Sequence, residues 1–114
     1  MAVGEHLRVG VHNHADTAVV HLDGELDLAS APLFEAELQR PEVADAATVV
    51  LDLRDLNFLD SAGLRMIVSA HALARERGQE FAVTRGPEQV QRLLSITRID
   101  EHLRIVEAPE ELGT

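Results

Sequence analysis

The sequence contains no cysteine and no tryptophan, and phenylalanine is its only aromatic type. The absence of cysteine excludes disulfide bonds and thiolate metal sites, and it fits a protein of a reducing compartment. No apolar run approaches the length of a membrane-spanning helix, and the amino terminus lacks the basic-then-apolar pattern of a signal peptide. We therefore expect a cytoplasmic protein without a membrane segment.

Basic residues are also few, since 10 of them face 20 acidic residues and the formal net charge is −10. The summed field of such a chain repels polyanions, so we expect no nucleic acid as a partner. The 114 residues suffice for one compact domain with a single core. We expect one domain over residues 1–114, with its core over about residues 5–108 and a short acidic tail after it.

Several motifs of catalysis and nucleotide binding are missing. The sequence has neither Gly-x-x-x-x-Gly-Lys-Ser/Thr nor a strand-linked Gly-x-Gly-x-x-Gly, the loops that bind nucleotide phosphates. Ser61 is not in a Gly-x-Ser-x-Gly elbow, because Leu59 occupies the position of the first glycine. His12 and His14 lie in a predicted turn without an acidic partner at a recognised metal-ligand offset. We expect no enzyme activity, no metal and no cofactor.

The hydrophobic pattern that is present predicts strands alternating with helices. Apolar residues alternate or run together in strands over residues 7–11, 17–23, 49–53, 81–84 and 103–106, and they recur at helical spacing over residues 27–41, 60–78 and 88–96. Gly24 is expected to end the second strand, and residues 41–47 to form an irregular connection. The order β-β-α-β-α-β-α-β predicts a single α/β domain whose mixed sheet is parallel except near the first strand.

The junction between the central strand and the following helix carries Asp60 and Ser61. Both residue types are preferred helix N-caps, because their oxygens accept hydrogen bonds from backbone N–H groups that have no partner inside the helix. The positive end of the helix dipole also favours anionic groups there. Ala62 and Gly63 keep the turn free of bulk, so the Ser61 hydroxyl should be open to an approaching molecule. The residues themselves also allow a purely structural role as a cap.

Asp27 occupies a corresponding position after the second strand. It can cap the next helix or present its carboxylate to a partner, and the two roles are compatible. Asp27 and Asp60 both follow strands that we expect to be parallel and adjacent, which places them at the same edge of the sheet, the usual location of sites in open α/β folds. On the central helix, Ala62, Met66 and Ser69 form a strip of low charge, which we expect to be either a docking surface or, at Met66, part of the core.

Two segments give the sequence a family resemblance. Gly24-Glu-Leu-Asp27 is followed, in the expected order, by Leu51-Asp-Leu53 and Phe58-Leu-Asp-Ser-Ala-Gly-Leu64. Together they resemble the signature segments of the STAS domain family, and in particular its anti-sigma factor antagonists. The resemblance implies the same α/β fold.

The resemblance also implies a function for Asp27, Asp60 and Ser61. Ser61 corresponds to the serine that a partner anti-sigma factor phosphorylates with its own kinase domain, which binds ATP and magnesium. The unmodified antagonist binds that partner and frees the sigma factor, and a phosphatase later resets the serine. Ala62 departs from many relatives, which have Ser or Thr there, so a second hydroxyl is missing.

The partner surface is predicted to contain Asp27, Asp60, Ser61, Ala62, Gly63 and Met66. Within the same fold, the alternative is a scaffold subunit of a stress-signalling or lipid-transport assembly without a phosphorylation cycle. In another class, the alternative is a small enzyme or nucleotide-binding domain.

Overall fold

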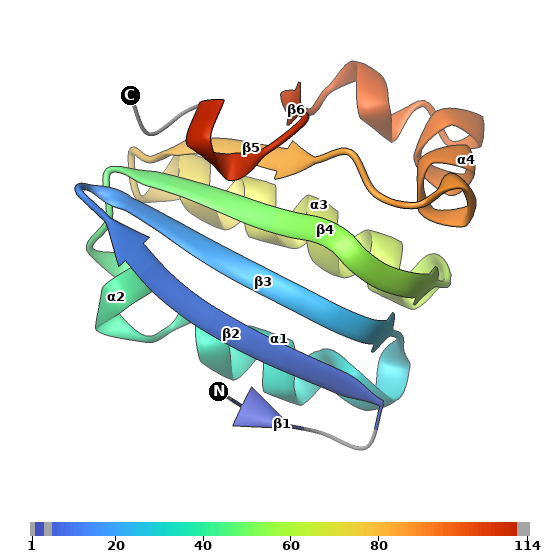
Figure 1. Ribbon diagram of the computed structural model, residues 1–114, viewed down its shortest axis with the longest axis horizontal. Coiled ribbons are helices and arrows are strands. Elements are labelled where there is room, and N and C mark those ends of the chain that lie inside the picture. The colour runs from blue at the N-terminus through green and yellow to red at the C-terminus, as the bar shows by residue number, and fades with distance from the viewer. Residues whose placement is uncertain (1, 4–5, 112–114) are drawn as a thin grey trace.

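The strands of the chain form one mixed sheet in the order β1-β2-β3-β4-β5-β6 (Figure 1). The computed structural model describes residues 2–3 and 6–111. The strands are β1 (Ala2–Val3), β2 (Leu7–His14), β3 (Thr17–Leu26), β4 (Thr48–Leu59), β5 (Glu80–Thr84) and β6 (Ile105–Val106). The pairs β1–β2 and β2–β3 are antiparallel, whereas β3–β4, β4–β5 and β5–β6 are parallel. The predicted α/β class with a mostly parallel sheet is confirmed.

Most of the helices lie on one face of this sheet. The helices are α1 (Ala31–Leu38), α2 (Pro41–Ala44), α3 (Ser61–Glu76) and α4 (Glu88–Ile96), with the 3₁₀ turns η1 (Leu28–Ser30), η2 (Ile99–Glu101) and η3 (Pro109–Glu111). In Figure 1, α1, α2 and α3 lie behind the sheet, while η3 lies in front of it. In the described part of the chain, no helix has both the length and the apolar character needed to cross a bilayer.

The hydrophobic core lies mainly between the sheet and α1 to α3, and α4 adds Val90 and Leu94 to it. Its fully buried side chains include Leu7, Leu22, Phe34, Leu51 and Ile67. They come from five elements, β2, β3, α1, β4 and α3, so burial of their apolar surface, worth roughly 25 cal/mol per Å², ties the strands to the helices. This packing fixes the position of the sheet edge at which β3 and β4 end.

Two strands are longer than their sequence pattern predicts. β4 continues to Leu59, so the expected crossing after residue 53 is regular strand with Leu56 and Leu59 buried. Gly24 does not end β3 but lies inside it, at a φ of +113°, beside a register shift relative to β4. A Cβ atom at Gly24 would overlap the carbonyl oxygen of His6, so only glycine fits this irregularity.

Two connections contain more structure than expected. Pro41 does not merely end the preceding helix, since it begins the short helix α2 at a position where its missing N–H is spare. The buried side chain of Val43 anchors α2 to the core. In the predicted acidic tail, Pro109 is buried and η3 packs on the face opposite α1 to α3, while residues 112–114 lie outside the described part.

Candidate functional site

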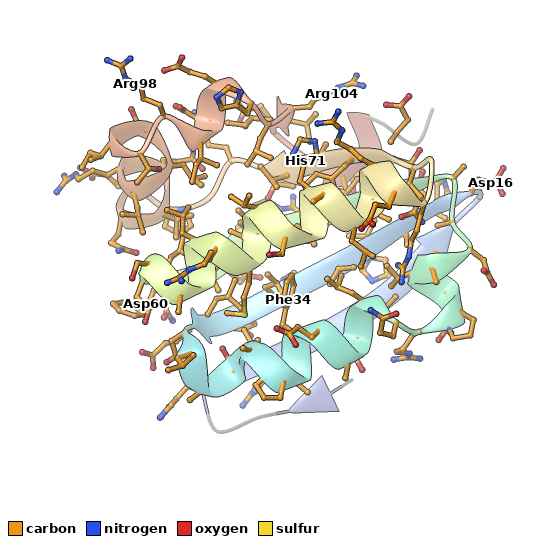
Figure 2. The ribbon with its side chains drawn as sticks, turned by 180° about the vertical axis from the view of Figure 1, so that it is seen from behind. Asp16, Phe34, Asp60, His71, Arg98 and Arg104 are labelled. Atoms are coloured by element: carbon orange, nitrogen blue, oxygen red, sulfur yellow. The ribbon has the colours of Figure 1, made fainter. Side chains whose placement is uncertain are left out.

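Asp27 and Asp60 leave the sheet side by side. In the parallel pairing of β3 with β4, Leu26 lies opposite Leu59, and each aspartate is the next residue along its chain segment. The carboxyl ends of adjacent parallel strands meet at one edge, as expected from the sequence. Figure 2 shows Asp60 where α3 begins, at the end of the sheet where η1 also lies.

Asp60, and not Ser61, caps α3. The Asp60 backbone is extended, and its Oδ1 accepts a hydrogen bond of 2.8 Å from the backbone N–H of Gly63. Ser61 is therefore the first residue of the helix, and its exposed hydroxyl takes no part in the cap. The carboxylate satisfies an N–H group of the first turn, while the serine hydroxyl remains accessible for chemistry.

Gly63 allows the first turn of α3 to lie against the end of β3. A Cβ atom at Gly63 would overlap the carbonyl oxygen of Leu26 and would lie 2.7 Å from a methyl group of Leu59. The residue is buried, so the structure gives it a packing role in the positioning of Ser61 rather than an exposed place on the predicted partner surface.

Met66 is not an exposed docking residue in the free chain. Its side chain is only 7% exposed and lines a small cavity of about 220 Å³ between α1 and α3, beside Phe34 and Ala70. The expectation of an exposed strip is wrong at this position, and the alternative of burial in the core holds. The helical period explains it, because Gly63, Met66 and Ala70 fall on the same buried face of α3. Ala62 is half-buried and Ser69 is exposed.

Asp27 fixes the turn that follows β3. Its Oδ1 accepts from the backbone N–H of Ser30 at 3.0 Å, and the Ser30 Oγ accepts in return from the backbone N–H of Asp27 at 2.9 Å. Asp27 and Ser30 thus form a reciprocal capping box. Asp27 remains half-buried at the surface, so its structural role leaves the carboxylate within reach of a partner.

Two exposed apolar side chains at this edge escaped the sequence analysis. Leu28, which directly follows Asp27, is 75% exposed. Phe58, two residues before Asp60, is 39% exposed. The other large exposed apolar residues of the described ranges are Val68 and Ile96. The sequence did contain a sign that Leu28 is exposed, because it is an apolar residue directly after a helix cap, where a turn has no core to contact.

A larger groove lies elsewhere, on the sheet face opposite α1 to α3. It encloses about 450 Å³ and is lined by His12, His14, Thr17, Val19, His21, Asp52, Arg54, Pro109 and Glu110. Among the residues that the structure describes, no group of three His, Cys, Asp or Glu side chains is arranged to bind a metal ion.

Asp52 forms the floor of this groove with Arg54. Burial favours the neutral form of Asp52, but two hydrogen bonds from the Arg54 guanidinium, one from its backbone N–H and its positive charge outweigh burial, so the pKa of Asp52 is lowered. The Thr84 hydroxyl also donates to Asp52 Oδ1 at 3.2 Å. This closed network joins β4 to β5 and gives the buried carboxylate a structural task.

Known proteins share both the sequence and the fold. The STAS domain family model matches residues 8–112. The chain is 29% identical over 92 residues to the anti-sigma F factor antagonist of Paenibacillus polymyxa, covering 80% of this chain and 79% of the relative. It superposes on an anti-sigma factor antagonist from Mycobacterium paratuberculosis with a TM-score of 0.82 at 22% identity, covering 97% and 94% of the two chains.

The fold is also shared by a solved protein whose structure was determined in its phosphorylated form. The Bacillus cell fate determinant SpoIIAA in its phosphorylated form superposes with a TM-score of 0.68 at 15% identity, covering 91% of this chain and 95% of SpoIIAA. The family match spans nearly the whole described domain, and the signature segments 24–27 and 58–64 lie where the adjacent strands β3 and β4 end. The chain belongs to the STAS domain family.

Proposed function

We propose that this chain is an anti-sigma factor antagonist that binds an anti-sigma factor through the edge formed by Asp27, Asp60 and Ser61. The anti-sigma factor would carry a serine kinase domain, and its capture would release a sigma factor for transcription. The observation that carries the proposal is the exposed Ser61 hydroxyl, which Asp60 frees from capping and which lies beside the exit of β3. The names of the relatives support the choice of partner.

Phosphorylation of Ser61 would switch this binding off. A phosphate group adds roughly −1.5 to −2 charges at neutral pH. The N-terminus of α3 can accommodate an anion locally, so the domain need not refold. The dianion would nevertheless stand next to Asp60 and close to Asp27, within the surface that meets the partner. Charge repulsion and the cost of removing water from the phosphate would then expel the anti-sigma factor.

The remaining components of the cycle belong to other proteins. The kinase domain of the anti-sigma factor would bind the ATP and magnesium, and a separate phosphatase would restore the Ser61 hydroxyl. SpoIIAA, whose phosphorylated form is known, shares this fold and supports a cycle of that kind. A scaffold subunit would instead bind its partners stably, without any dependence on ATP.

The decisive experiment combines a pull-down with site assignment. The purified chain is mixed with extract of the source cell, with and without ATP, and captured proteins and the modified residue are identified by mass spectrometry. We expect an anti-sigma factor to be retained without ATP and lost with ATP, with the phosphate on Ser61. Phosphate at another residue, or modification of Ser61 that leaves the partner bound, would refute the switch. ATP-independent capture without any phosphate would favour the scaffold.

A further inference from the structure

Leu28 is the most exposed of the large apolar side chains in the described residues, at 75%. It is the first residue of η1, directly after Asp27, and it contributes almost nothing to the core. A polar residue would serve this turn at least as well, because the side chain faces water. Its backbone is nevertheless held in place by the reciprocal hydrogen bonds of Asp27 and Ser30. The turn thus presents the leucine from a backbone that is held in place.

Leu28 is the second residue after the end of β3, and Ser61 is the second residue after the end of the adjacent strand β4. Because Leu26 pairs with Leu59, Asp27 corresponds to Asp60 and Leu28 to Ser61. The close fit of Gly63 on the Leu26 carbonyl keeps the first turn of α3 against the exit of β3. Leu28 and Ser61 therefore lie in the turns that follow two adjacent strands, at the same edge of the sheet.

The surroundings of Leu28 define the chemistry of what it meets. Asp27 and Asp60 lie at the same edge, and Glu25 pairs in register with the partly exposed Phe58. The whole chain carries a formal charge of −10. A surface complementary to this edge combines an apolar pocket with basic groups around it.

We infer that Leu28 is the apolar anchor of the docking surface and that it inserts into an apolar, basic-rimmed pocket of the anti-sigma factor. This inference rests on the proposed function, since it assigns a residue to the same interface. Because the backbone of this turn is already held by the Asp27–Ser30 hydrogen bonds, binding orders little additional backbone, and the area that Leu28 buries contributes efficiently to affinity. Leu28 then supplies affinity, while Asp27 and Asp60 supply orientation.

The position of the anchor also links binding to the switch. A phosphate on Ser61 would hold a shell of water at the edge of the sheet that also carries Leu28, and a partner that covers this edge must remove that water. Phosphorylation would therefore weaken the apolar contact as well as the charged ones. No movement of α3 is required for this effect.

Truncation of Leu28, with a matched control elsewhere, tests the inference. Ile96 is 70% exposed near the C-terminal end of α4, and Figure 2 shows Arg98, close behind it in the chain, well separated from Asp60. Affinity of the purified anti-sigma factor would be measured calorimetrically for the wild type, Leu28→Ala, Leu28→Met and Ile96→Ala. We expect Leu28→Ala to lower affinity by about tenfold or more. Ile96→Ala and Leu28→Met should stay within about threefold of the wild type, and all melting temperatures should agree.

The outcomes separate the inference from the proposed function. If the wild type binds and Leu28→Ala binds equally well, the anchor is refuted while the proposed function stands. If Ile96→Ala loses as much affinity as Leu28→Ala, the loss is not specific to this edge and the anchor is refuted as well. If the wild type binds no anti-sigma factor, both fail. Sedimentation of the chain alone completes the test, because a loss of self-association in Leu28→Ala without a loss of anti-sigma factor binding would make a second copy the occupant.

Discussion

The division of labour between Asp60 and Ser61 separates stability from regulation at the level of single residues. Because Asp60 accepts the hydrogen bond from Gly63, the Ser61 hydroxyl is dispensable for the cap. We expect Ser61→Ala to unfold at nearly the wild-type urea concentration, and to bind the anti-sigma factor equally with and without ATP. A binding titration in the presence of active kinase measures the second effect. ATP-dependent loss of binding by Ser61→Ala would contradict the assignment of the switch.

The reverse substitution should imitate the modified state in part. Ser61→Asp adds a negative charge next to Asp60, and we expect affinity to fall without ATP. A carboxylate carries less charge and fewer acceptor oxygens than a phosphate, so the loss should be smaller than that caused by phosphorylation. Calorimetry of the phosphorylated wild type and of Ser61→Asp side by side gives the comparison. Equal affinity of Ser61→Asp and the unmodified wild type would argue against repulsion as the mechanism.

Asp27 combines two tasks that one substitution can separate. Asparagine caps about as well as aspartate, so Asp27→Asn should keep the hydrogen bond to Ser30 and the wild-type melting temperature. It removes one negative charge from the docking edge, so affinity for a basic partner should fall severalfold, and the loss should shrink at high salt. Unchanged affinity would confine Asp27 to its role in the turn.

At the level of elements, the contact of α3 with the exit of β3 depends on Gly63. Any Cβ atom there overlaps the Leu26 carbonyl, so Gly63→Ala must push the first turn of α3 outward. Strain of this kind typically costs about 1–3 kcal/mol of unfolding free energy. Urea denaturation measures it, with Ser61→Ala as the control in the same turn. A Gly63→Ala protein as stable as the control would show that α3 can shift without cost.

The same elements show what the sequence could and could not predict. Two parallel strands, each followed by an aspartate, predicted that Asp27 and Asp60 would lie at the same edge of the sheet, because this depends only on strand order. The length of β4 was missed because the register shifts around Gly24 break the regular alternation of the sheet. Met66 was ambiguous because the buried face of α3 depends on where α1 places Phe34, a contact between distant segments. Leu28 lay outside any periodic pattern.

At the level of the whole molecule, the buried Asp52 couples stability to pH. The Arg54 hydrogen bonds lower its pKa in the folded chain below that of the unfolded chain, which is about 3.9 for aspartate. Its stabilising contribution is therefore complete above the unfolded pKa and is lost as the pH falls through the folded one. We expect Asp52→Asn to destabilise the protein at pH 7.

The difference between wild type and Asp52→Asn should narrow in acid, once the wild-type carboxyl is protonated. Urea unfolding at pH 7, 5 and 3 measures this convergence. Glu88→Gln serves as the control, because its ion pair with Arg92 joins two exposed side chains and should matter little at any pH. A stability difference between wild type and Asp52→Asn that is constant over this range would contradict the role of the ionised carboxylate.

The tip of the β2–β3 hairpin lies at the end of the sheet opposite Asp60, as the positions of Asp16 and Asp60 in Figure 2 show. The sheet therefore has one end where docking is proposed and an opposite end formed by the hairpin tip. Since the chain has no cysteine, Asp16→Cys would supply a unique thiol at the exposed hairpin tip. Coupled through that thiol to a flat support, every molecule would stand with Ser61 directed outward, so an immobilised layer would offer its partner a single, uniform orientation.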